Sequence, residues 1–175
     1  MIKDLKNITL IVIDVDGVLT NGSIIIDEEG KEQKFFDVKD GHLIHLAVDA
    51  GLKIVWVSGR YSKATNRRAW ATGIHFVLQN QRDKIKSLNI IKEKFKVSED
   101  EIAYIGDDLI DIPPMLVCAF SAAPCDAAEE VRERVDYISP YDGGKGAVRD
   151  ILKLILKSKG LWEKLLQRYT CGVSE

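Results

Sequence analysis

The sequence has little of what marks the more specialised classes of protein. Its three cysteines, Cys118, Cys125 and Cys171, stand in no metal-ligand spacing, and an odd number fits reduced thiols better than a disulfide framework. The formal net charge of −2 gives no electrostatic reason to expect nucleic acid or a membrane surface as a partner. The apolar run at residues 8–13 is too short for a secretory signal core or a membrane span. These absences favour a location in the cytoplasm.

What the sequence does contain is a regular alternation of expected strands and helices. Its 175 residues, of which 46% are hydrophobic, are expected to form one domain spanning 1–175. The expected strands are 8–13, 53–57, 75–78, 102–105, 119–122 and 136–138, and the expected helices are 41–50, 62–72, 82–95, 113–117, 127–134 and 145–157. This order predicts βαβ units, and therefore an α/β fold with a doubly wound parallel sheet.

Two segments depart from the alternation. Residues 22–27 and 32–36 predict a β-hairpin that projects directly after the first strand. Its apolar side chains, Ile24, Ile26, Phe35 and Phe36, need a partner, unless they fold back onto the parent domain. Residues 161–175 begin as an amphipathic helix and are expected to end as a loose tail.

Carboxylates follow two of the expected strands. Asp14 and Asp16 come at the end of the first, and strand residues two apart point the same way, so both can converge on one site. An isolated pair of this kind is more often a solvated turn. Asp107, Asp108 and Asp111 follow the strand at 102–105, and carboxylate oxygens are the ligands that hard divalent cations prefer.

A hydroxyl and a lysine follow two other expected strands. Ser58 and Gly59 offer a hydroxyl and backbone N–H groups where a helix starts, which is a natural oxyanion site. Lys84 lies near the start of the next helix. An ordinary helix terminus and a solvated lysine are the simpler interpretations of each feature alone. Because ligands of doubly wound sheets bind outside the carboxyl ends of the strands, the order of all these features favours one common site.

Four features follow one another along the chain: Asp14 with Asp16, then Ser58, then Lys84, and last Asp107. They match, in turn, the four motifs of the haloacid dehalogenase-like phosphohydrolases, which the sequence closely resembles. The resemblance implies a Rossmann-like fold and a phosphatase in which Asp14 is the nucleophile that forms an aspartyl-phosphate and Asp16 is the acid and base. Lys84 would offset negative charge.

The same resemblance implies a cofactor and its ligands. Mg²⁺ would be held by Asp14, the backbone carbonyl of Asp16, and Asp107. Asp108 and Asp111 would support the metal site from behind, and Ser58 with Gly59 would hold phosphoryl oxygens.

The spacing of the motifs leaves no room for an inserted cap domain, since 41 residues separate Asp16 from Ser58 and 25 separate Ser58 from Lys84. The capless arrangement resembles the 3-deoxy-D-manno-octulosonate 8-phosphate phosphatases from residue 8 to about 157. The matching segments are 14–20, 36–41, 59–60, 106–111 and 143–149. The resemblance implies an enzyme that removes the phosphate from 3-deoxy-D-manno-octulosonate 8-phosphate, a step in the synthesis of lipopolysaccharide precursors. It also implies a homotetramer in which a neighbouring subunit helps to close each site.

The family's substrate contacts map onto a larger set of residues: Asp16, Asp37, Val38, Lys39, Asp40, Gly41, His45, Ser58, Gly59, Arg60, Arg68 and Lys84. Arg60 and Arg68 are expected two turns apart on one helix, and paired guanidinium groups suit a substrate with a carboxylate and a phosphate. Lys39 and His45 stand where the family commonly has arginine, so they lose the bidentate fork.

Two other functions stay open. A phosphatase for another 2-keto sugar acid, such as a nonulosonate 9-phosphate, would share the same capless scaffold. A non-catalytic phospho-aspartate switch or scaffold would also pair acidic loops with Ser or Thr and Lys. Asp16 argues against the switch, because a slow switch has no need for a positioned acid and base.

Overall fold

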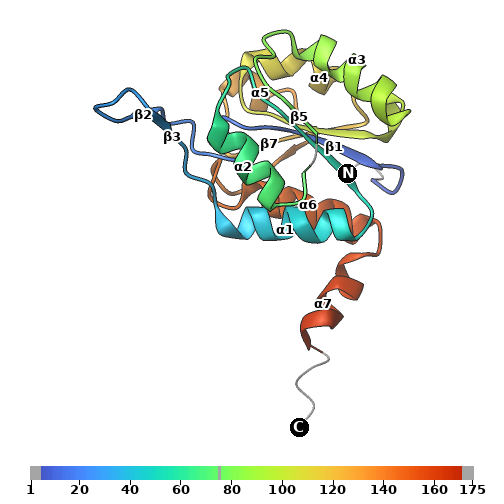
Figure 1. Cartoon of the computed structure of the whole chain (residues 1–175). Helices are drawn as coiled ribbons and strands as arrows, with labels where there is room; N and C mark the ends of the chain where they lie inside the picture. The colour runs from blue at the N-terminus through green and yellow to red at the C-terminus, as the bar shows by residue number, and fades with distance from the viewer. Residues whose placement is uncertain (1–4, 75, 171–175) are drawn as a thin grey trace.

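The computed structural model describes residues 5–74 and 76–170 and is built around one parallel sheet (Figure 1). Its strands are β1 (Leu10–Asp14), β4 (Lys53–Val57), β5 (Val77–Leu78), β6 (Ile102–Ile105), β7 (Phe120–Ala123) and β8 (Tyr137–Ile138). They lie in the order β5-β4-β1-β6-β7-β8, and every pairing is parallel. The predicted doubly wound α/β fold is confirmed, with β1 at the centre of the sheet.

Helices cover both faces of the sheet. They are α1 (Val38–Asp49), α2 (Lys63–Ala71), α3 (Lys84–Phe95), α4 (Ile112–Val117), α5 (Glu129–Arg132), α6 (Ala147–Ser158) and α7 (Trp162–Thr170), with short 3₁₀ helices η1 (Glu99–Glu101) and η2 (Leu109–Asp111). Ile11 and Ile13 of β1 pack on the side of α1 and α6, whereas Leu10 and Val12 pack on the side of α3 and α4 (Figure 1). A strand that is covered on both faces must be apolar throughout, which is why β1 reads as a continuous hydrophobic run.

Side-chain caps set several helix boundaries that periodicity alone placed elsewhere. The helix expected at 41–50 begins at Val38, because the Asp37 carboxylate accepts the N–H groups of Lys39 at 2.6 Å and Asp40 at 2.9 Å. The helix expected at 127–134 is only four residues long, Glu129–Arg132. The first residue of the strand expected at 75–78 lies outside the described residues.

The start of α2 corrects one prediction about the site. Ser62 is the N-cap, and its hydroxyl accepts the N–H of Ala64 at 3.2 Å, so the helix begins at Lys63. Arg60 therefore lies in the loop before the helix. The prediction that Arg60 and Arg68 share one helix, two turns apart, is wrong.

The predicted hairpin is present and projects away from the sheet (Figure 1). Its strands, β2 (Ile25–Ile26) and β3 (Glu32–Gln33), pair antiparallel and are shorter than expected. Phe36 folds back, and its ring lies 6.1 Å from that of Trp56, but Ile24, Ile26 and Phe35 are more than half exposed. The hairpin thus keeps most of its apolar surface free.

The polypeptide between the motifs carries no inserted domain in residues 5–74 and 76–170. After α6 the chain forms α7, whose Trp162 and Leu165 are buried; the expected tail at 171–175 lies outside the described residues. None of the helices in the described part of the chain is long and apolar enough to cross a membrane.

Candidate active site

The centre of the candidate site is a buried lysine between two buried aspartates. Asp14 is the last residue of β1, and the Lys84 ammonium lies 2.5 Å from its Oδ1. The same ammonium lies 2.5 Å from Oδ1 of Asp111. Burial opposes the charged form of Lys84, but the two carboxylates outweigh burial and raise the pKa of the lysine. The structure therefore brings together residues 14 and 84 as a charged pair inside the protein.

A third carboxylate lies close to this centre, so its acidic groups outnumber the one lysine. Oxygens of Asp14, Asp107 and Asp111 lie within 4.8 Å of one another. Burial raises the pKa of Asp14 to about 7, against the opposing effect of Lys84 and with the help of Asp111. Burial together with the charges of Asp14 and Asp111 raises the pKa of Asp107 to about 8. One lysine is not enough to stabilise three ionised carboxylates at neutral pH.

The oxygens that remain free indicate where a metal ion fits. Oδ1 of Asp107 is buried and has no hydrogen-bond partner among the described residues. Asp111, in contrast, accepts from the Tyr104 hydroxyl at 3.0 Å and from the backbone N–H groups of Asp107 and Asp108 at 3.4 Å. A divalent cation with oxygen ligands would satisfy both the free oxygen and the excess negative charge, so the residues fit Mg²⁺.

Gly17 explains how Asp107 comes so close to the loop after β1. Its φ of +95° lies in the left-handed region, and a Cβ at this position would overlap the Asp107 carboxylate. A glycine is required here for both reasons. The turn thus brings the acidic groups of two strands to one point.

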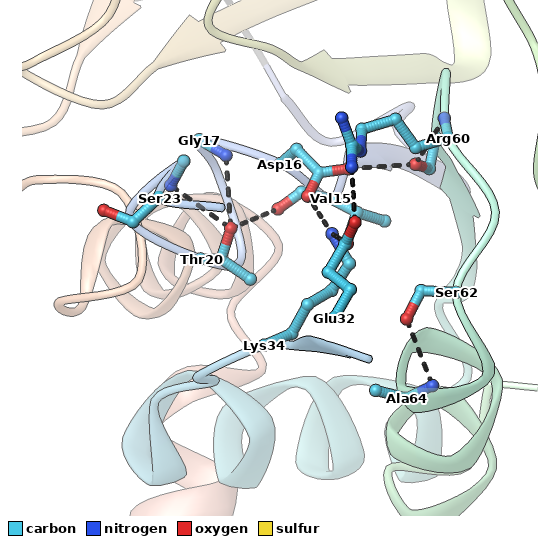
Figure 2. Close-up of polar contacts among 12 residues, drawn as sticks. Val15, Asp16, Gly17, Thr20, Ser23, Glu32, Lys34, Arg60, Ser62 and Ala64 are labelled. Atoms are coloured by element: carbon cyan, nitrogen blue, oxygen red, sulfur yellow. Dashed lines mark hydrogen bonds and ion pairs between the residues drawn. The ribbon is translucent and has the colours of Figure 1, made fainter. Parts of the chain in front are cut away.

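Asp16 lies beside this centre and is held from two sides (Figure 2). The Ser58 hydroxyl donates to its Oδ2 at 3.1 Å, and the Lys34 ammonium forms an ion pair with its Oδ1. The backbone N–H of Arg60 donates to Ser58 Oγ at 3.1 Å, while its guanidinium pairs with Glu32 of the hairpin.

Lys34 and Glu32 were not among the site residues predicted from the sequence. The signal that could have found them is the alternation expected for an extended segment at 32–36, which places 32, 34 and 36 on one side.

Arg68 lies at the edge of an open groove of about 890 Å³ between the hairpin and α2. Its guanidinium donates to the Asp37 carbonyl at 3.0 Å. It also lies against Gly41, where a Cβ would overlap it. These contacts keep Arg68 beside the hairpin, on the same groove as Lys34.

Asp40 was expected to bind substrate, and that role stays a prediction. Its side chain is 1% exposed and accepts the N–H groups of Gly146, the N-cap residue of α6, at 3.2 Å and of Arg149, the third residue of α6, at 2.7 Å. Burial raises its pKa to about 6, although both backbone bonds oppose the shift. Asp40 therefore joins α1 to the start of α6.

Other predicted substrate residues lie apart from the aspartate centre. Lys39 lines a hollow of about 200 Å³ with Arg149, and His45 lines a separate one of about 270 Å³ with Val38. Neither hollow includes any of Asp14, Asp16, Ser58 or Lys84. A part for Val38, Lys39 and His45 in substrate binding stays a prediction.

Asp108 is exposed, and its carboxylate accepts the backbone N–H of Leu109 at 2.8 Å. It caps η2, the 3₁₀ helix that carries Asp111. Asp108 can therefore support the metal site only indirectly, by stabilising the backbone of the loop that carries Asp111. Asp111 contacts Lys84 and the Tyr104 hydroxyl, and its support of the metal site stays a prediction.

Comparison with known proteins agrees with this geometry. A family model for haloacid dehalogenase-like hydrolases matches residues 61–152. The 3-deoxy-D-manno-octulosonate 8-phosphate phosphatase KdsC of Escherichia coli K12 is 36% identical over 91% of this chain and 85% of its own length. The Moraxella catarrhalis enzyme of that name, solved with a magnesium ion, a phosphate ion and KDO, superposes with a TM-score of 0.93 at 35% identity, covering 95% of both chains. The cobalt-bound Haemophilus influenzae enzyme gives a TM-score of 0.88 at 35% identity over 91% of this chain and 94% of its own. The chain therefore belongs to the 3-deoxy-D-manno-octulosonate 8-phosphate phosphatase family of haloacid dehalogenase-like hydrolases.

Proposed function

We propose that this protein is a magnesium-dependent phosphatase that converts 3-deoxy-D-manno-octulosonate 8-phosphate into the free sugar acid and phosphate, a step of lipopolysaccharide precursor synthesis. The observation that carries the proposal is the centre at the end of β1. There the buried carboxylate of Asp14, the proposed nucleophile, is paired with Lys84 and lies close to the Asp107 oxygen that has no hydrogen-bond partner among the described residues. The activity named for the relatives and the ligands in the Moraxella catarrhalis structure support the choice of substrate.

In the proposed reaction Asp14 forms the new bond to phosphorus. Its carboxylate oxygen attacks the phosphoryl group, the bond between phosphorus and the sugar oxygen breaks, and Asp16 gives its proton to the departing oxygen. Asp16 then takes a proton from water, whose oxygen attacks the phosphorus and releases Asp14 with inorganic phosphate. Two steps with a covalent intermediate replace one step that is extremely slow in water.

The charges around the nucleophile make this approach possible. Asp14, the backbone carbonyl of Asp16, and Asp107 would hold Mg²⁺, which when bound supplies positive charge that lets a carboxylate approach a phosphate dianion. Lys84 adds a fixed positive charge at the nucleophile itself. The Ser58 hydroxyl and the Gly59 N–H would hold phosphoryl oxygens as the charge shifts.

The sugar acid itself would be recognised beside the hairpin. Arg60 and Arg68 supply guanidinium groups there, and Arg68 lines the groove of about 890 Å³ between the hairpin and α2. A guanidinium group binds a carboxylate through two parallel hydrogen bonds, which suits a substrate with a carboxylate far from its phosphate. We also place the enzyme in the cytoplasm, because a sugar acid that carries both a carboxylate and a phosphate does not cross a membrane unaided.

We further propose a homotetramer in which the hairpins of neighbouring subunits help to close each site. The support is the exposed apolar surface of the hairpin, which includes Ile24, Ile26 and Phe35. An isolated two-stranded ribbon is marginally stable in water and needs a partner. Sedimentation equilibrium should therefore give four times the mass of the chain, and a monomer at micromolar concentration would contradict the proposal.

A substrate panel tests the proposed activity. We expect kcat/KM for the eight-carbon sugar-acid 8-phosphate to exceed that for simple sugar phosphates by at least about tenfold, because the guanidinium groups have no partner in the latter. Removal of divalent metal with a chelator should abolish turnover, and added Mg²⁺ should restore it.

Each other outcome of the panel has a definite meaning. Preference for a nine-carbon sugar-acid 9-phosphate would favour the other 2-keto sugar acid, and equal kcat/KM across the panel would refute sugar-acid specificity. If no sugar phosphate and no acyl phosphate released phosphate with Mg²⁺ present, the non-catalytic phospho-aspartate switch would replace the enzyme.

A further inference from the structure

Lys34 is a buried charge on an otherwise exposed hairpin. Its side chain is only 4% exposed, whereas the neighbouring residues Gln33 and Phe35 face solvent. The ammonium contacts Oδ1 of Asp16 and lies 3.1 Å from Oε1 of Glu32 (Figure 2). A buried ammonium is costly unless it is paired, so these two carboxylates determine where the Lys34 side chain lies.

The contact with Lys34 completes the fixation of the Asp16 carboxylate. Ser58 holds one oxygen at 3.1 Å, and Lys34 holds the other. The terminal torsion of an aspartate is broad and roughly two-fold, so a carboxylate with one donor retains rotational freedom. Two donors that come from different parts of the chain, one on each oxygen, remove that freedom.

Lys34 also closes a ring of polar contacts. Glu32 joins Lys34 to the Arg60 guanidinium, and the Arg60 backbone N–H leads back to Ser58 at 3.1 Å and so to Asp16. The ring connects the loop after β1, the hairpin and the loop after β4 (Figure 2). Its two cations and two anions balance, so it forms without an unpaired charge.

We propose that Lys34 is a positioning residue for Asp16, and that the hairpin thereby helps to build the active site of its own chain. The inference rests on the proposed function, in which Asp16 exchanges a proton with the departing sugar oxygen. Proton transfer requires the two oxygens to be within hydrogen-bond reach, and a displacement of about 1 Å can cost roughly 100-fold in rate. Removing Lys34 leaves Asp16 chemically intact but free to rotate away.

The leaving group separates this role from a general loss of structure. A sugar alkoxide needs a proton to depart, whereas p-nitrophenolate departs without one. We expect Lys34→Met to lower kcat/KM for the sugar-acid phosphate by about 10- to 100-fold and that for p-nitrophenyl phosphate by less than about threefold. Lys34→Arg keeps the charge and should recover part of the loss.

Lys86→Met is the matched control. It makes the same change at a lysine that is 79% exposed and paired with Asp83 on the surface of the protein. An exposed pair of this kind contributes little, so both kcat/KM values should match those of the wild type. An equal loss on both substrates in Lys34→Met would contradict the positioning role.

A double-mutant cycle shows whether Lys34 acts through Asp16. In an Asp16→Asn background, Lys34→Met should cause no further loss of kcat/KM on the sugar-acid phosphate. If the two losses multiply, or if Lys34→Met raises KM and leaves kcat unchanged, Lys34 binds the substrate directly and the inference is wrong.

Hydrogen exchange of the hairpin provides a readout that needs no turnover. Lys34→Met and Asp16→Asn both weaken the same ion pair, so each should speed amide exchange in residues 25–33 relative to Lys86→Met. Unchanged exchange in both would overturn the inference. A wild-type protein without phosphatase activity would contradict the proposed function instead, and hydrogen exchange would still decide whether Lys34 holds Asp16.

Discussion

Replacement of Asp14 by asparagine is expected to abolish phosphate release and to leave the protein folded. The amide has nearly the same shape as the carboxylate, but it cannot form the aspartyl-phosphate. Loss of a nucleophile costs most of the catalysis, so kcat with Mg²⁺ should fall by at least about 10⁴-fold. The charge of Lys84 stays paired after the substitution, because Asp111 also lies 2.5 Å from its ammonium.

The melting temperature should accordingly change little, which a thermal scan beside the phosphate-release assay would show. Asp100→Asn is the matched control, since Asp100 is exposed in η1, at the end of β6 opposite the site. This control should retain full activity. An Asp14→Asn protein with substantial turnover would overturn the assignment of the nucleophile, and with it the proposed mechanism.

Replacement of Lys84 by methionine should affect both activity and stability. Methionine fills much of the same space but leaves Asp14 and Asp111 without their shared cation. Removing one partner of a buried ion pair destabilises a protein by about 3–5 kcal/mol. Losing a fixed positive charge at the reacting group should lower kcat by about 10²–10³-fold. Urea unfolding and phosphate release would measure the two effects.

The loss of stability in Lys84→Met should grow as the pH rises. A carboxyl whose pKa is raised by folding takes up a proton when the chain folds, so the free energy of unfolding falls as the pH rises from about 4 through the folded pKa. For Asp14 the folded pKa is about 7 in the wild type, with Lys84 opposing the shift. Without Lys84 it rises further, so metal-free Lys84→Met should lose more stability at pH 8 than at pH 5.5.

Lys86→Met again provides the control, because it removes the same charge two residues along the same helix from an exposed pair. Its free energy of unfolding should stay within about 1 kcal/mol of the wild-type value at both pH values. Equal stability of Lys84→Met and Lys86→Met at pH 8 would show that the buried ammonium does not compensate the two carboxylates. The pH 5.5 measurement keeps the test possible if Lys84→Met is unfolded at pH 8.

The aspartate centre could be predicted because it depends on a simple geometric rule. In a parallel sheet the carboxyl ends of all strands meet at one edge, so residues just after different strands come together. Asp14 ends such a strand, Ser58 and Asp107 come just after two others, and Lys84 opens the helix after a fourth. Periodicity and order along the chain were therefore enough to place them close to one another.

The contacts around the centre could not be predicted in the same way. Asp40 and Lys39 are neighbours on α1, yet one is buried against α6 and the other lines a surface hollow. Which face of α1 packs inward depends on α6, about a hundred residues further along the chain. The motif match assigned both residues to substrate binding, but it could not show that one is buried and the other lies at the surface.

The sequence by itself determined the fold class and the residues of the proposed chemistry, because these follow from hydrophobic periodicity and from the order of the motifs. Only the tertiary structure decided how Asp16 is oriented. Its partner Lys34 belongs to a hairpin with two-residue strands, and the direction in which such a short ribbon folds back is set by packing, as between Phe36 and Trp56. Local propensity holds no information about such long-range contacts, so the pairing of Lys34 with Asp16 follows from the tertiary structure.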